Sequence, residues 1–222
     1  GEVPAGISAG WDGYRGTPNL VRLFEYANND KPKASEIKDR RGIFFDKNRS
    51  IDITTAVNGT FKTEGWAVYK YTNLKSNGES GSNSTFPDTD FPLFRLADVY
   101  LMYAEAVARG GQGGDLATAV GYVNDLRERA YGDRLHGVNE AWLKADNYRN
   151  ILNERGRELY WEALRRTDLI RFGLFTSASY LWPYKGGVMG GIGVDNRYNV
   201  FPIPATDLSV NGSLQQNDGY KN

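Results

Sequence analysis

The sequence predicts a mainly α-helical protein in which helices pair as antiparallel hairpins and the rest of the chain forms long loops with short strands. Three observations lead to this prediction. Apolar residues recur at helical spacing between residues 91 and 130, a second helical pattern covers residues 148–172, and the flanking chain is rich in Gly, Asn, Ser and Pro. The length of 222 residues allows one domain or at most two.

The first 90 residues are predicted to be mostly loops. Turn-forming residues interrupt this region repeatedly, and the Ser-, Gly- and Asn-rich stretch at 76–88 is typical of a solvated loop. Short apolar pieces at 42–45 and 66–71 are candidates for strands, the second with Trp66 as a packed strand residue. A short helix is expected after Thr17, which would be its N-cap, with Pro18 at the first helical position.

Residues 91–130 are predicted to form a helix hairpin. The segment 93–109 is apolar almost all round, so we expect this helix to be buried on most sides. A glycine-rich link at 110–114 ends it, and a second helix begins after the candidate N-cap Asp115. So short a link makes the two helices antiparallel neighbours. The polar exceptions of the first helix fall on one stripe: Arg95, Asp98, Glu105 and Arg109.

A third helical segment is expected from residue 148 to residue 172, and a shorter helical piece at 139–146 would complete a second hairpin. Oppositely charged side chains lie three or four residues apart along the polar side of this segment. Exposed pairs of this kind contribute roughly a few tenths of a kcal/mol, so the use of Arg in place of Lys indicates bidentate or packed contacts. The sets are Glu154 with Arg157, Glu162 with Arg165 and Arg166, and Asp168 with Arg171.

The composition excludes several classes of function. Lys and Arg number 27, as do Asp and Glu, so no surplus of positive charge exists for a nucleic acid, and none is expected as a partner. The absence of Cys and the presence of a single His, His136, exclude thiolate zinc sites and His-pair metal sites, and we expect no metal and no cofactor. No run of 18 apolar residues is present, and the first ten residues lack the pattern of a signal peptide.

Five motifs follow one another in the second half of the chain: FPLFRLADVYLMYAEAVARGG, AVGYVNDLRERA, ILNERGRELYWEALRRTDLIRFG, NVFPIPATDL and LQQNDGY. In this order and spacing they resemble the C-terminal half of the SusD/RagB family of Bacteroidetes outer-membrane glycan-binding lipoproteins. The resemblance covers residues 91–220 well. Two earlier segments, GWDGYRGTPNLVRLFEYANND and DRRGIFF, resemble the same family more loosely.

The resemblance implies tetratricopeptide-like helix pairs that carry a loop-rich face for a polysaccharide or oligosaccharide, beside a TonB-dependent, SusC-like transporter at the outer membrane. On this basis we expect residues 1–90 to be a loop-rich segment with glycan-facing aromatic residues, residues 91–176 to form helical hairpins, and residues 177–222 to be an irregular segment packed on the helices. Members of the family are commonly longer, so the fold is expected to be incomplete here. Membrane attachment would then use an anchor absent from this chain.

A site for neutral sugars needs flat aromatic rings that pack on the C–H face of a pyranose, with amides, carboxylates and Arg around them. The loop at residues 10–19 provides such a set, and another aromatic pair lies in a glycine-rich stretch near residue 184. Alternatively, the rings of Trp11 and Tyr14 pack against the helical core and bind no sugar. Trp142 and Trp161 are expected to pack between helices. The candidate glycan-binding residues are Trp11, Asp12, Tyr14, Arg15, Asn19, Trp182 and Tyr184.

No enzymatic activity is expected. A glycosidase needs two carboxyl groups, one of them with a raised pKa. The pair Asp88 and Asp90 lies in a flexible loop, and Glu154 and Glu158 are surrounded by Arg, which favours their ionised form. The prediction is therefore a non-catalytic protein that binds a glycan for uptake. The alternative is a tetratricopeptide-like scaffold that binds a protein or peptide in its helical groove and binds no sugar.

Overall fold

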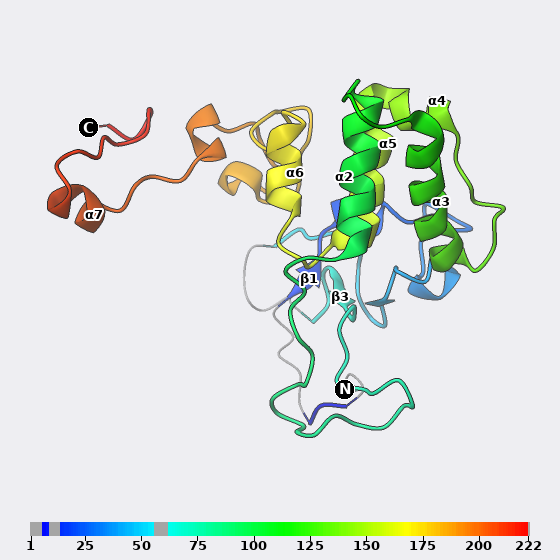
Figure 1. Cartoon of the computed structure of the whole chain (residues 1–222). Coiled ribbons are helices and arrows are strands. Elements are labelled where there is room, and N and C mark those ends of the chain that lie inside the picture. Colours follow the sequence, from blue (N-terminus) through cyan, green and yellow to red (C-terminus); the bar gives the residue numbers. More distant parts are fainter. Residues whose placement is uncertain (1–5, 9–13, 56–61, 222) are drawn as a thin grey trace. The chain divides into compact units, whose positions relative to one another are not determined.

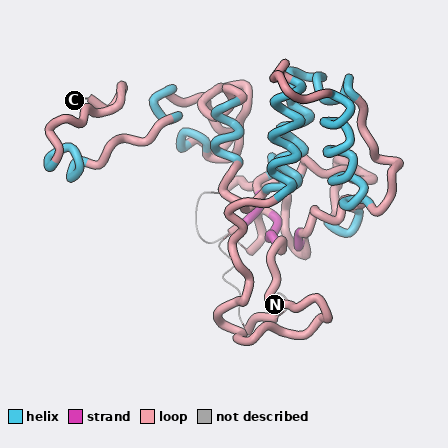
Figure 2. Tube along the Cα trace, in the orientation of Figure 1, coloured by secondary structure: helices cyan, strands magenta, loops and turns pink. Residues whose placement is uncertain are grey.

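The computed structural model describes residues 6–8, 14–55 and 62–221. The chain divides into two compact units, residues 1–165 and residues 166–222. Within the described residues, helices dominate between residues 96 and 171, and loops make up most of the remaining chain (Figure 2). The fold is mainly helical, as predicted. None of the described helices has the length and apolar character needed to cross a membrane.

The first unit contains the predicted hairpin of α2 and α3, which lie side by side in it (Figure 1). Side-chain caps begin two of its helices: Asp115 accepts a hydrogen bond from the Thr118 N–H at 2.8 Å, and Asn139 accepts one from the Trp142 N–H at 3.0 Å. The predicted N-cap Asp115 is thereby confirmed. The helices are α2 (Leu96–Ala108), α3 (Leu116–Tyr131), α4 (Glu140–Lys144), the 3₁₀ turn Ala145–Tyr148 and α5 (Arg149–Leu159).

The core of the hairpins combines mostly small residues on α2 with mostly larger residues on its neighbours. Ala97, Ala104 and Ala108 are buried on α2, which allows α3 to approach closely. Trp142 is half-buried against this core, as predicted. The larger buried side chains of the cluster are Leu101, Val123, Leu126, Leu143, Ile151 and Leu159.

A small antiparallel sheet forms the second core of this unit. Trp66 is 2 % exposed and confirms the packed strand residue predicted for this segment. Tyr160, just after α5, inserts its ring among Phe24 and Phe44, which fixes the end of the helical layer to the sheet. Thr17 is the N-cap residue of α1 and Pro18 its first helical residue, as predicted, but the Thr17 side chain makes no capping hydrogen bond. The elements are β1 (Arg15–Gly16), α1 (Pro18–Val21), the 3₁₀ turn Ala34–Glu36, β2 (Phe44–Phe45) and β3 (Trp66–Val68), in sheet order β1-β3-β2.

One apolar side of α2 is exposed, contrary to the expectation of a helix buried on most sides. Its polar stripe faces partners inside the unit: Asp98 pairs with Arg155 at 2.8 Å, and Glu105 is 5 % exposed. The apolar residues Leu96, Val99 and Met102 are 61 %, 49 % and 50 % exposed. The expectation was wrong because periodicity reveals stripes on a helix and does not show which stripe meets a neighbour.

The third helical segment is not continuous, which corrects the expectation of one helix from 148 to 172. The chain leaves helical geometry after Leu159 and enters α6 (Arg165–Arg171) only after a turn. Trp161 and Ala163 in this turn have φ of 64° and 61°, in the left-handed region. Glu162 consequently points away from Arg165 and Arg166 and pairs with Lys70 and Arg95 instead.

The second unit begins within α6 and consists of short helical turns joined by loops. The predicted pair between Asp168 and Arg171 is present at 2.8 Å. Lys185 is 3 % exposed, and its ammonium group donates hydrogen bonds to the carbonyl oxygens of Ser177 and Tyr180 at 2.5 and 2.8 Å. The remaining elements are the 3₁₀ turns Lys185–Gly187 and Asn196–Asn199 and the helix α7 (Ala205–Val210).

Candidate functional site

The turn that follows α5 presents an aromatic ring to solvent. Tyr160 and Glu162 are both buried and point into the unit. Trp161 lies between them with left-handed backbone geometry and is 42 % exposed. This corrects the expectation that Trp161 packs between helices, because the left-handed turn rotates its ring away from the core.

Tyr14 lies against this ring. Its own ring is 77 % exposed and meets Trp161 edge to face, with ring centroids 5.9 Å apart and an interplanar angle of 80°. Tyr14 immediately precedes β1, whose backbone is fixed by pairing with β3 and by the Arg15 guanidinium, which donates a hydrogen bond to the Glu64 carbonyl at 2.9 Å. Two exposed rings thus lie against each other next to a paired strand, an arrangement suited to the C–H face of a sugar.

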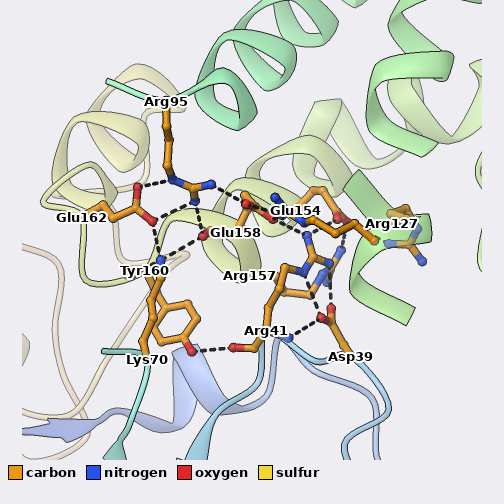
Figure 3. A network of polar contacts seen from close by, with 11 residues as sticks. Asp39, Arg41, Lys70, Arg95, Arg127, Glu154, Arg157, Glu158, Tyr160 and Glu162 are labelled. Carbon is orange, nitrogen blue, oxygen red and sulfur yellow. Dashed lines mark hydrogen bonds and ion pairs between the residues drawn. The ribbon is translucent and has the colours of Figure 1, made fainter. Parts of the chain in front are cut away.

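A buried network of charged side chains holds the turn in place (Figure 3). Three glutamates contribute to it: Glu154 and Glu158 lie four residues apart on α5, and Glu162 lies in the turn that follows. They are 0 %, 3 % and 5 % exposed and accept bonds from cations of several segments. Those cations are Arg41, Lys70, Arg95, Arg127, Arg129 and Arg157.

Glu158 is at the centre of this network. Its carboxylate accepts hydrogen bonds from Arg95 and Arg129 at 2.6 Å and from Arg41 at 3.0 Å. Burial alone would raise the pKa of Glu158, but the bonds from Arg129 and Arg95 and the charge of Arg41 lower that pKa to about 2. Glu158 is therefore ionised at neutral pH and has no proton to give to a leaving group.

Glu154 is also a buried carboxylate whose pKa is lowered by neighbouring guanidinium groups. Burial would raise its pKa, while the charges of Arg157, Arg41 and Arg127 lower the pKa of Glu154 to about 2. Arg41 also holds Asp39 with two bonds of 2.9 and 2.7 Å, and its backbone carbonyl accepts from the Tyr160 hydroxyl at 2.5 Å. The prediction that Arg keeps the pair Glu154 and Glu158 ionised agrees with these contacts.

The sequence-predicted residues fall in different places. Trp11 and Asp12 lie outside the described residues. Tyr14 is at the exposed ring pair, Arg15 supports it from β1, and Asn19 is half-buried in α1. Their role in binding a glycan stays a prediction.

Trp182 and Tyr184 belong to the second unit and are half-buried there. Trp182 packs against Phe175 and Tyr180 at centroid distances of 5.8 and 6.3 Å, and the Lys185 ammonium lies 4.6 Å from its ring centre. Much of this ring is thus engaged by its own unit. A glycan contact at Trp182 and Tyr184 also remains a prediction.

Sequence reasoning missed Trp161 as an exposed ring. The motif YWEALRR is typical of a helix, so the sequence predicts no turn here. The turn is seen only in the structure, where Tyr160 and Glu162 are buried and Trp161 between them is exposed. Within the described residues, no group of three or more His, Asp or Glu side chains is arranged to hold a metal ion.

A family model and two curated proteins that resemble this chain all belong to the SusD group. The SusD family model matches residues 48–220. The starch-binding protein SusD of Bacteroides thetaiotaomicron is 45 % identical over 169 residues, which are 76 % of this chain and 28 % of that protein. A SusD-like protein, P25, of Formosa agariphila is 33 % identical over 134 residues, 59 % of this chain and 24 % of that protein.

Solved structures show the same fold. A SusD-like protein from Bacteroides fragilis aligns with a TM-score of 0.56 at 20 % identity, covering 95 % of this chain and 48 % of that one. Surface glycan-binding protein A from Bacteroides uniformis aligns with a TM-score of 0.55 at 20 % identity, covering 97 % and 45 %. The chain spans about a quarter of the curated relatives and less than half of these solved chains.

Proposed function

The chain belongs to the SusD family, and from this premise we propose that it binds a polysaccharide or oligosaccharide without transforming it. The observation that carries the proposal is the exposed ring pair of Tyr14 and Trp161. Two rings of this kind supply the flat apolar contact that a pyranose needs. Starch is the first ligand to try, because a relative that is 45 % identical is named a starch-binding protein.

The non-catalytic part of the proposal is supported by the carboxylates. Glu154 and Glu158 are each held ionised by several guanidinium groups, whereas a glycosidase needs a protonated carboxyl group as its acid. Their bonds are all directed to groups inside the protein. We assign them to the support of the Trp161 turn.

The cellular part of the proposal rests on the family. The proposed place is the outer membrane of a bacterium, as a surface lipoprotein, and the proposed partner is a TonB-dependent, SusC-like transporter that takes up the captured glycan. Capture in this form is physical: weak contacts on aromatic rings raise the local concentration of the oligosaccharide near the transporter.

Affinity gel electrophoresis tests glycan binding, with starch and a series of plant, host and microbial polysaccharides in the gel. We expect starch to retard the protein, and Tyr14→Ala and Trp161→Asn each to weaken the apparent affinity about tenfold, or about 1.4 kcal/mol. Asn is chosen at position 161 because it tolerates a φ of 64°. Phe86→Ala, which removes another ring that is 73 % exposed, should leave retardation unchanged.

Two outcomes contradict the proposal. Retardation by none of the polysaccharides would reject glycan binding, and equal retardation of the wild type and both ring variants would reject this surface as the site. Circular dichroism of Trp161→Asn confirms that any lost retardation does not come from unfolding.

A further inference from the structure

An open pocket of about 400 Å³ lies beside the buried network of the first unit. Its walls come from the chain before β2, the segment after β3, the residues at the start of α2, and the ends of α3 and α5. A pocket of this size can receive a small ligand such as one sugar residue. Its basic lining residues are Arg40, Arg41, Lys70, Arg95 and Arg129.

Positive charge is in excess in this pocket. Glu158 and Glu162 are the acidic side chains of its lining, so five positive charges face two negative charges, a net charge of +3. The groups behind the pocket leave this balance unchanged, because Arg127 and Arg157 add two positive charges while Asp39 and Glu154 add two negative ones. A concave, partly desolvated surface with such an excess attracts anions.

Both lining carboxylates are already fully engaged. Glu158 accepts from Arg41, Arg95 and Arg129, and Glu162 accepts from Arg95 and Lys70. They therefore have little capacity to neutralise a further cation. The donors that remain open belong to the rim of the pocket.

Three groups offer open donors there. Among the described residues, none forms an ion pair or hydrogen bond with the exposed Arg40 guanidinium. Arg129 is 55 % exposed and uses its Nη2 for Glu158, which leaves its other nitrogens open. The Tyr71 hydroxyl is buried and has no hydrogen-bond partner within the described part of the chain. A buried hydroxyl without a partner is costly unless a ligand supplies one.

Arg40 and Arg129 both line the pocket, and their backbones lie close together. The Arg40 N–H donates to the Ala130 carbonyl at 2.9 Å, so Arg40 lies beside the last turn of α3, which carries Arg129. An oxyanion in the pocket would offset the repulsion among the excess positive charges of its lining. Guanidinium groups also match the planar geometry of a carboxylate or sulfate.

We propose that this pocket binds the carboxylate or sulfate group of an acidic saccharide, with Arg40 and Arg129 as the ion-pairing donors. The Tyr71 hydroxyl supplies a further hydrogen bond in the wall. The assignment to a saccharide rests on the proposed function above. The assignment to an oxyanion rests on the pocket alone.

The test is isothermal titration calorimetry of the whole chain with D-glucuronate, D-glucose and sodium sulfate. Glucuronate and glucose share a ring and differ in the carboxylate, so they form a matched pair. We expect glucuronate to bind, glucose not to bind at the same concentrations, and added salt to weaken the affinity for glucuronate. Arg40→Gln and Arg129→Gln should each weaken glucuronate binding at least fivefold, while Arg134→Gln, an exposed Arg outside the pocket lining, should leave it unchanged.

The outcomes separate the two proposals. Equal binding of glucose and glucuronate, or an unchanged affinity in Arg40→Gln, would overturn the oxyanion pocket. Binding of neither glucuronate nor sulfate would overturn it as well. Starch retardation that persists when glucuronate fails to bind rejects the pocket alone, whereas glucuronate binding without retardation by any polysaccharide rejects the proposed polysaccharide binding and leaves the oxyanion pocket in place.

Discussion

Arg95 and Glu162 form a bidentate ion pair that joins the start of α2 to the turn after α5. The Arg95 Nε and Nη2 donate to the two carboxylate oxygens of Glu162 at 2.6 and 2.8 Å (Figure 3). The same carboxylate accepts from Lys70, in the segment after β3. One buried side chain thus holds three separate parts of the chain around the exposed ring of Trp161.

Removing the charge of Glu162 is expected to destabilise the first unit strongly. Glu162→Gln leaves Lys70 buried without its carboxylate and deprives Arg95 of one of its two, and an unpaired buried cation costs about 3 kcal/mol. Urea unfolding followed by circular dichroism measures the loss. Glu128→Gln is the matched control, since its ion pair with Arg134 is exposed and should contribute less than about 1 kcal/mol. Equal losses in the two variants would contradict the assignment.

The free energy of unfolding should fall as the pH is lowered from about 5 to about 2. The pKa of Glu154 and that of Glu158 are lowered from 4.5 to about 2 in the folded chain, so both groups stabilise the fold when ionised. This contribution is present above the unfolded pKa and is lost as the pH falls through the folded pKa, on the order of a few kcal/mol in all. Urea midpoints measured at several pH values test this, and Glu158→Gln should show a shallower dependence. A midpoint that does not change below pH 5 would contradict the prediction.

The helix hairpins could be predicted from the sequence because their signals are local. Apolar spacing, the glycine-rich link and the cap Asp115 all lie within a few residues of the elements they define. The burial of Trp66 followed in the same way from the alternation of its strand.

The support of the candidate site could not be predicted, because its partners are distant in sequence. Glu158 meets Arg41, which is 117 residues away, and Arg95, which is 63 residues away. The local pairing rule assigned Glu162 to Arg165 and Arg166, whereas tertiary contacts give it Lys70 and Arg95. The exposure of Trp161 depends on a left-handed turn among good helix formers, for which the sequence carries no signal.

The outward face of α2 should tolerate charge. Val99 is 49 % exposed, so Val99→Lys is expected to change the free energy of unfolding by less than about 0.5 kcal/mol. Leu101, two residues away and 0 % exposed, is the control: Leu101→Ala should cost about 2–5 kcal/mol through the cavity it leaves. Urea unfolding of the two variants checks this. A large loss for Val99→Lys would mean that this face of α2 is covered in the protein.

The turn that presents Trp161 should become more stable when Ala163 is replaced by Gly. Ala163 has a φ of 61°, where a side chain is disfavoured and Gly is not. Ala163→Gly is therefore expected to raise the free energy of unfolding by about 0.5–1 kcal/mol, because the strain relieved in the fold exceeds the added flexibility of the unfolded chain. Ala106→Gly, at an exposed position inside α2, is the matched control and should lower the free energy of unfolding by about 1 kcal/mol. If Ala→Gly raises the free energy of unfolding at position 163 and lowers it at position 106, the left-handed turn is present in solution. Destabilisation by both variants would instead show that residue 163 is helical and that the turn does not hold Trp161 outward.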